Sequence, residues 1–540
     1  MAGVAALAVT WAVAGAPEPA AEMSSDAARL ERQAVGAELS RGLAGLYIKG
    51  ADRPYALRAT LQRATLLYAV GRYGALVESQ LVRRAMGEVE ARVGAPARDS
   101  TQFFGSGARV VFQLPLVPDA EAARRAVWLA ADAAYKGALE SLDMRGAAEA
   151  SLNAPTQIPD WSPAPTPLEA AGGQADCEDS ASRMAGARRW LSAERGRVEA
   201  LTRTLSEGFN GAPWIERGEV AVQAVVAQRD DLDTDGLARC ESRIELVIAV
   251  VAQARAADGL VLPRAAVLHL RDEEWLGVQG WKTLATKGSA LVAETVEALA
   301  LLVEAPRVEE DYDGPLVLSA SAAAQLLAVT VVPHASGTPA PLSEYGPMTE
   351  LQPHWIDSLG TQVMPPWIDL SDDPHLAGGF GSYGEDTQGV WAQPIDVVGG
   401  GVLRSLWMTR HPNASMPTSN GRSRGTLSLM EGTSASNLTL RSHRPGSGAE
   451  ALEEDALARA REDGYDHIYV VESLRDESVL GVNEIDEAAG YGTGRRVDLP
   501  APATLVRVGA DGSRTLVRGA LLSSASLRVL RRIRALGDAP

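Results

Sequence analysis

The chain has 540 residues, 46% of them hydrophobic and 22% charged, which is enough to bury more than one core. It carries 51 basic and 69 acidic side chains, so the formal net charge is −18. A surface of this sign repels phosphate backbones instead of recruiting them by counterion release. We therefore expect no nucleic-acid partner.

The first 16 residues are uncharged and end in Ala14, Gly15 and Ala16, an A-x-A-like cleavage site before Pro17. This run is too short to span a bilayer, which takes ~20 apolar residues. We expect residues 1–22 to be a signal-like or disordered segment, with no integral membrane span. The favoured location is periplasmic or secreted, and the alternative is cytoplasmic.

The N-terminal part alternates between strand and helix patterns. Period-2 alternation predicts strands over 87–94 and 107–116, and Pro118 with Asp119 opens a helix. Proline and glycine between 152 and 180 predict an extended connection, and a second helix is expected over 181–206. The apolar face of the first helix is formed by Trp128, Ala131, Tyr135, Ala138 and Leu142.

Two further runs, 219–228 and 242–254, predict a hairpin about an acidic turn, and a helix is expected over 289–303. Beyond 307–313 the sequence is rich in glycine and short strands. These patterns predict an α+β fold: an N-terminal domain, residues 23–306, with a mixed sheet and long helices, and a β-rich C-terminal domain, residues 307–540.

The acidic turn resembles the start of a calcium loop. Asp231, Asp233, Asp235 and Gly236 fit D-x-D-x-D-G, but the position of the bidentate glutamate is Ser242, and strands flank the turn where an EF-hand has helices. We interpret these carboxylates as a solvated hairpin turn, with calcium binding as the less favoured alternative.

Residues 421–425 spell G-x-S-x-G, the pattern of a nucleophile elbow. An elbow requires a strand that leads into a helix, whereas here a loop precedes the motif and a strand is expected after it. The sequence therefore favours a glycine-bounded loop over a serine hydrolase. The two cysteines, Cys177 and Cys240, either pair in an oxidising compartment or remain free.

Several co-linear segments carry a family resemblance. Residues 371–425 contain a DDP turn, a D-x-x-G-V segment that begins at Asp386, a G-x-L hairpin and an S-N-G-x-x-R loop. With the strand patterns from Arg53 and over 73–94, and the closing strand and helix over 514–533, the chain resembles the TldD/TldE (PmbA) family of bacterial metalloproteases. It is most similar to a TldD-related subgroup of exported members. The resemblance implies a TldD/PmbA-like fold for both domains.

The family's zinc helix has a degenerate counterpart at residues 314–334. Aligned with the family's LLHEAVGH, the segment places Ala328 and Pro333 at the two histidine positions and Val329 at the general base. A catalytic zinc needs three protein ligands, a bound water and a carboxylate that takes its proton. The resemblance therefore implies a TldE-like member without the HExxxH motif and without a cofactor of its own, zinc being expected only in a TldD-type partner.

The function implied is that of a non-catalytic subunit in a heteromeric protease that acts on unfolded peptides. The dimer partner would be a zinc-bearing TldD-like paralogue or a second copy of the chain. One alternative is a stand-alone peptide-binding or scaffold protein of the cell envelope, and another is an active metallopeptidase with an atypical metal site. The residues expected at a peptide-binding or interface surface are Asp386, Asn420, Arg424 and Asn437.

Overall fold

The computed structural model describes residues 25–105, 107–152, 158–163, 173–276, 279–425, 431–476 and 496–538. The expected signal-like segment, residues 1–22, lies outside these ranges. Within them, every helix is too short or too polar to cross a lipid bilayer.

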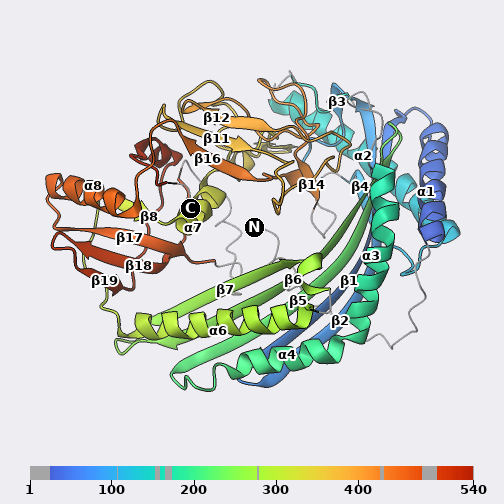
Figure 1. Ribbon diagram of the computed structural model, residues 1–540. Coiled ribbons are helices and arrows are strands. Elements are labelled where there is room, and N and C mark those ends of the chain that lie inside the picture. The colour runs from blue at the N-terminus through green and yellow to red at the C-terminus, as the bar shows by residue number, and fades with distance from the viewer. Residues whose placement is uncertain are drawn as a thin grey trace.

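A long, curved antiparallel sheet forms the N-terminal part (Figure 1). Its hydrogen-bonded order is β3-β2-β1-β5-β6-β7, and β4 pairs with β2 as well. Tyr73 and Gly74 have positive φ angles of 48° and 84°, as a two-residue hairpin turn between β1 and β2 requires. The strands are β1 (Pro54–Arg72), β2 (Ala75–Ala95), β3 (Arg98–Asp99), β4 (Arg109–Gln113), β5 (Ile215–Asp233), β6 (Ala238–Arg255) and β7 (Val261–Arg271).

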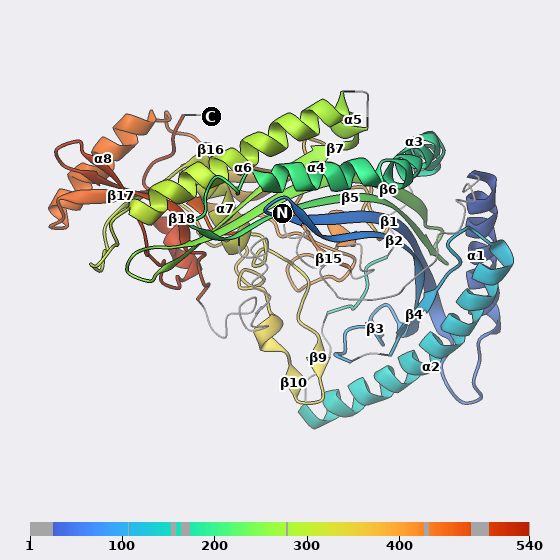
Figure 2. The ribbon, with the colours of Figure 1, turned by 90° about the horizontal axis from the view of Figure 1, so that it is seen from below.

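Helices cover only one face of this sheet (Figures 1 and 2). The side chains of Leu57, Ala59 and Leu61 in β1 point to that face and pack against α1 and α2. Further along β1, Leu67 and Ala69 join the core beneath α3, α4 and α6. Alternate residues of each strand therefore lie on a second face, which these helices leave uncovered. The helices are α1 (Ser25–Gly45), α2 (Ala120–Leu152), α3 (Gly173–Ala193), α4 (Arg195–Glu207), α5 (Asp272–Trp275) and α6 (Gly280–Glu304).

The helix expected after Asp119 is confirmed as α2. The Asp119 carboxylate accepts the backbone N–H groups of Glu121 and Ala122 and so caps this helix. The helix expected over 181–206 is present, but as two helices, α3 and α4, with a break at Glu194. α3 already begins at Gly173, inside the expected extended connection, where glycine predicts a loop.

The hairpin between β5 and β6 is confirmed, but not the solvated setting of all its carboxylates. Asp233 closes the turn by accepting the N–H groups of Asp235 and Leu237. Asp231 is instead fully buried within β5 and ion-paired. The tip of the turn could be inferred locally, whereas the burial of Asp231 depends on a distant part of the chain.

Cys240, one strand away in β6, is buried and disulfide-bonded, and Cys177 is the chain's other cysteine.

The C-terminal part begins with a sheet of order β19-β18-β17-β8, in which β8 is parallel to β17. Two helices pack on its opposite faces: Ala322 of α7 contacts the cluster of Tyr469 and Val471, and Ala460 of α8 contacts that of Ile468 and Val470. The elements are β8 (Leu316–Leu318), α7 (Ala320–Thr330), α8 (Ala449–Glu462), β17 (His467–Leu474), β18 (Pro502–Gly509) and β19 (Arg514–Val517).

A second four-stranded sheet and two short hairpins complete the chain. The sheet order is β13-β12-β11-β16, and its core gathers around the buried Trp407. The expected last helix is a short 3₁₀ turn, Leu527–Arg532. The α+β class with a β-rich C-terminal part is thus confirmed. The remaining strands are β9 (Leu342–Ser343), β10 (Gly346–Pro347), β11 (Ile368–Asp372), β12 (Ile395–Gly399), β13 (Val402–Leu403), β14 (Ser423–Gly425), β15 (Glu431–Thr433) and β16 (Leu438–Ser442), and a 3₁₀ turn lies at Thr349–Leu351.

Candidate functional site

Helix α7 contains most of the segment that the sequence resemblance aligns with the family's zinc helix. Its N-cap is Ser319, whose hydroxyl accepts the Ala322 N–H at 3.1 Å, and it ends at Thr330, three residues before Pro333. Ala328 and Pro333 are exposed, and Val329 is half-buried. None of these three side chains has a lone pair to offer a metal or to take a proton.

Two histidines, His334 and His354, lie beside each other just beyond α7. They are twenty positions apart in the sequence, so spacing did not predict this contact. The rings of His334 and His354 stack with centroids 4.2 Å apart and an interplanar angle of 9°. Burial, together with the neighbouring ring, lowers the pKa of His334 to about 4, so this imidazole is neutral near pH 7. Across the described ranges, no group of three or more His, Cys, Asp or Glu side chains is placed to hold a metal ion.

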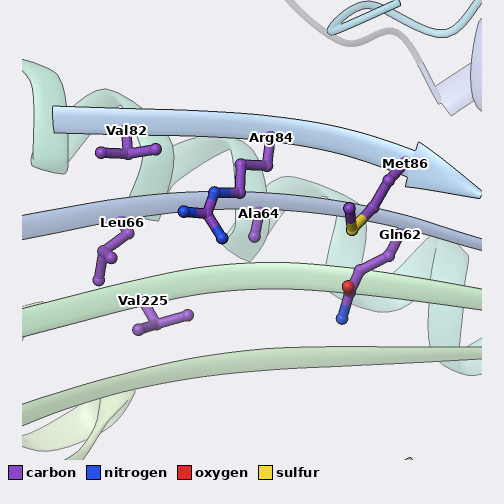
Figure 3. A pocket seen from close by; sticks show the side chains of 7 residues that line it. All are labelled: Gln62, Ala64, Leu66, Val82, Arg84, Met86 and Val225. Atoms are coloured by element: carbon purple, nitrogen blue, oxygen red, sulfur yellow. The ribbon is translucent and has the colours of Figure 1, made fainter. Parts of the chain in front are cut away.

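The uncovered face of the N-terminal sheet carries a pocket (Figure 3). Strand pairing sets Ala64 opposite Arg84 of β2 on one side and Ala227 of β5 on the other. The cross-strand pairs on either side of Ala64, Gln62 with Met86 and Leu66 with Val82, have larger side chains. The small Ala64 side chain therefore leaves a hollow between these pairs. The pocket is lined by Gln62, Ala64, Leu66, Val82, Arg84, Met86 and Val225.

Next to this pocket, a buried ion-pair network joins the sheet to the C-terminal part. The Asp231 carboxylate of β5 forms ion pairs with Arg58, Arg229 and Arg239, with nitrogen–oxygen distances of 3.0, 2.9 and 3.1 Å. Burial opposes the ionisation of Asp231, but the three guanidinium groups prevail and lower its pKa. The network therefore keeps a fully buried carboxylate charged.

Residues from the C-terminal part complete the network. Glu431 of β15 accepts from Arg58 and from Arg229, each at 2.6 Å. Arg424 of β14 donates to Glu241 of β6 at 2.8 Å, and its guanidinium carbon lies 4.1 Å from the centroid of the Tyr383 ring. The β14–β15 hairpin is thus held against the sheet by paired charges on both strands.

Three of the four expected site residues use their polar atoms inside the chain. Asp386 is fully buried and accepts the N–H groups of Gln388, Val390 and Ser423. Burial raises its pKa to about 6, although these hydrogen bonds act in the opposite direction. In this arrangement Asp386 anchors the loop before β12 to the start of β14.

The side-chain amides of Asn420 and Asn437 also form hydrogen bonds with backbone groups of this chain. The Asn420 side chain accepts from the Met408 N–H at 2.8 Å and donates to the Leu406 carbonyl at 2.7 Å. Asn437 accepts from the Gly381 N–H and donates to the Asp373 carbonyl. Among the four, Arg424 is the one whose side chain, 25% exposed, joins the interdomain network. A peptide-binding or interface role for these residues stays a prediction.

A central ion pair of the signature region was missed. Arg422 and Asp372 are both fully buried and pair at 3.0 Å, and Asp372 also accepts the Trp407 indole N–H at 2.7 Å. The sequence carries both residues, Asp372 as the first aspartate of the DDP turn and Arg422 directly after Ser419, Asn420 and Gly421, but the S-N-G-x-x-R motif assigns significance to Arg424 instead. Ser423 starts a strand, and its hydroxyl lies 2.8 Å from that of Thr387, which confirms that G-x-S-x-G is no nucleophile elbow here.

Comparisons with known proteins now define the class. Residues 312–485 match the family model described as the PmbA/TldA metallopeptidase C-terminal domain. A 56-residue stretch is 34% identical to Metalloprotease PmbA of Escherichia coli O157:H7 and spans 10% of this chain and 12% of that protein's length.

Solved structures share the whole architecture. The chain is similar to TldE from Thermococcus kodakarensis, with a TM-score of 0.55, 13% identity, and 93% of this chain and 94% of that chain covered. It is also similar to a protein from Bacteroides thetaiotaomicron described as a candidate modulator of DNA gyrase, with a TM-score of 0.55, 11% identity, and coverage of 96% and 95%. Residues 312–485 thus match a PmbA/TldA-type metallopeptidase domain, and the fold of the chain is that of the TldE-like solved structures. The domain match, the short curated match and the shared fold together support a relation to the TldD/TldE (PmbA) family.

Proposed function

We propose that this chain is the non-catalytic, TldE-like subunit of a heteromeric protease that acts on unfolded peptides. The observation that supports the proposal is the chemistry of Ala328 and Val329 in α7 and of Pro333 just after it, which the resemblance aligns with two metal ligands and a general base. Such side chains preserve packing but supply neither a ligand nor a base. The partner would be a zinc-bearing TldD-like paralogue, with self-association as the alternative.

Two measurements on the purified full-length chain test this proposal. Elemental analysis should find far less than one zinc per chain, and light scattering of the chain mixed with its paralogue should give the mass of a heteromer. Peptidase activity of the mixture should disappear when the paralogue's own HExxxH glutamate is replaced. About one zinc per chain, with activity of the isolated chain that a chelator abolishes, would establish the atypical metallopeptidase instead.

A stand-alone peptide-binding protein remains the second candidate, because the pocket over Ala64 is built entirely from this chain. A monomer at micromolar concentration, alone and in the mixture, would favour that candidate.

We also propose that the protein is exported. The A-x-A-like end of residues 1–16 and the disulfide bond of Cys240 both support an oxidising compartment. Mass spectrometry of protein from its native cell should find a mature N-terminus near Pro17. Recovery of the intact Met1 peptide as the dominant N-terminus would refute export.

A further inference from the structure

The pocket over Ala64 combines apolar walls with two polar side chains that have no hydrogen-bond or ion-pair partner among the residues that the structure describes. Strand alternation points all seven lining side chains to the face that the helices leave uncovered. Figure 3 shows Arg84 bending over β1 beside Ala64, with Leu66 and Val82 on one side and Met86 and Gln62 on the other.

Gln62 is the first unpartnered group. It is only 4% exposed, yet its amide makes no hydrogen bond to any residue that the structure describes. The Gln62 amide is not among the fully buried side-chain atoms that lack a hydrogen bond, so water reaches it, and a ligand in the pocket can replace that water. The amide lines the pocket, so its missing partner can be supplied from there.

Arg84 is the second. Its guanidinium is exposed and forms no ion pair with a described residue, whereas Arg58 and Arg229, on the same face of the sheet, are both held by carboxylates. A guanidinium presents a planar fork of donors that fits a carboxylate in a bidentate manner. Arg84 is therefore placed to receive an anionic group that enters the pocket.

We propose that this pocket binds the C-terminal residue of a peptide, and this inference rests on the proposed peptide-binding function. The free α-carboxylate pairs with Arg84, and an aliphatic side chain fills the hollow between Leu66, Val82 and Val225. The last peptide group of the ligand exchanges hydrogen bonds with the Gln62 amide, which can both donate and accept.

A fatty acid offers a similar charge and apolar tail, but it has no amide for Gln62. The peptide therefore offers Gln62 a hydrogen bond that the lipid cannot offer.

The test is fluorescence anisotropy of the full-length chain with a labelled hexapeptide that ends in leucine, as the free acid and as the C-terminal amide. We expect the amide to bind at least tenfold more weakly. Arg84→Gln should reduce binding of the free acid to the level of the amide, and Ala64→Leu should abolish binding by filling the hollow.

The matched control is Arg83→Gln. Arg83 precedes Arg84 but points to the helix side, where it donates to the Ser192 hydroxyl at 3.2 Å. This variant should bind the free acid like the wild type. Equal affinity for acid and amide, or unchanged binding by Arg84→Gln, would overturn the inference.

Decanoate provides the remaining arm. If decanoate binds through Arg84 and the peptide acid does not, the pocket is a lipid site and the peptide inference fails. The two proposals fail separately: a chain that forms the heteromer but ignores the C-terminal carboxylate refutes only the pocket inference. A chain that prefers the acid but stays monomeric beside its paralogue refutes only the proposed heteromer.

Discussion

Arg58 of β1 and Glu431 of β15 are separated by 373 positions in the sequence and form a bidentate ion pair, with nitrogen–oxygen distances of 2.7 and 2.6 Å. Both side chains are nearly buried, at 12% and 7% exposure. Glu431 also accepts from Arg229, so one carboxylate from the C-terminal part satisfies two guanidinium groups of the sheet. This contact fixes the β14–β15 hairpin on the uncovered face, next to the pocket.

Replacing Glu431 by glutamine should destabilise the protein strongly. The substitution keeps the shape but leaves Arg58 and Arg229 buried with one negative charge fewer, which costs about 3 kcal/mol. Urea unfolding followed by tryptophan fluorescence measures the loss. The control is Glu462→Gln on α8, whose exposed pair with Arg459 contributes at most about 0.5 kcal/mol. Similar midpoints for both variants would show that the interdomain pair is not stabilising.

The hairpin offers a matched pair of glycines on neighbouring strands. A Cβ at Gly425 would lie 2.1 Å from Arg229 Nη1, whereas a Cβ at Gly432 meets nothing within 4 Å. Gly425→Ala should therefore lower the free energy of unfolding by about 1–3 kcal/mol, because the buried guanidinium has to move. Gly432→Ala should be nearly neutral, although Gly432 pairs directly with Arg424 in the same hairpin. Thermal unfolding of both variants checks this, and equal effects would contradict it.

Glu241 should make part of the free energy of unfolding depend on pH in the acidic range. Burial opposes its ionisation, but Arg424 and Arg239 prevail and lower the pKa of Glu241 to about 2. This folded-state pKa lies below the pKa of about 4.3 in the unfolded chain. The contribution of Glu241 to the free energy of unfolding is therefore complete above about pH 4.3, and it is lost as the pH falls from there toward the folded-state pKa.

In Glu241→Gln, the free energy of unfolding should therefore fall less steeply between pH 4.5 and pH 2 than in the wild type. The difference should be about 1–2 kcal/mol after solvent screening of this partly exposed group. Unfolding curves at a series of pH values measure it. Glu462→Gln should keep the wild-type slope, and an equally steep Glu241→Gln profile would show that Glu241 does not contribute.

Trp161 should be essential to a second contact between the two parts. Two guanidinium groups lie over its ring, with Arg92 Cζ at 3.4 Å and Arg410 Cζ at 4.4 Å from the centroid. The adjoining backbone is held as well, because the Ser162 N–H donates to the Arg410 carbonyl at 2.8 Å. The buried aromatic ring therefore attracts both guanidinium groups.

Trp161→Ala should cost about 3–5 kcal/mol, since it removes a buried aromatic side chain and leaves the two cations facing a cavity. Limited proteolysis should then cut near residues 158–163 faster than in the wild type. The control is Trp128→Ala on α2, where the side chain is 45% exposed. Unchanged cleavage of Trp161→Ala would contradict a clamping role.

The start of α2 and the β5–β6 hairpin could be predicted because their signals are local, whereas the starts of α3 and α6 lie several residues before the expected ones. In β1, residues that alternate along the strand divide between the helix-covered core and the uncovered face, and Asp119 caps α2 through its own neighbours. The family's signature positions were also recognised from short motifs. Their roles were not, because Asp386 and Asn437 bond to backbone groups that the motif does not specify.

The sequence by itself determined that Ala328, Val329 and Pro333 offer neither a metal ligand nor a general base, since their side chains have no lone pair in any conformation. Only the tertiary structure decided which charges are buried and which remain free. Asp231 reads as a turn carboxylate until Arg58 and Arg239 are brought beside it. Arg84 reads as one arginine among many until strand pairing places it beside Ala64 on the uncovered face, with no ion-pair partner in the described part of the chain. The physical reason is that backbone propensity acts between near neighbours, whereas the pairing of charges depends on which distant strands the fold sets side by side.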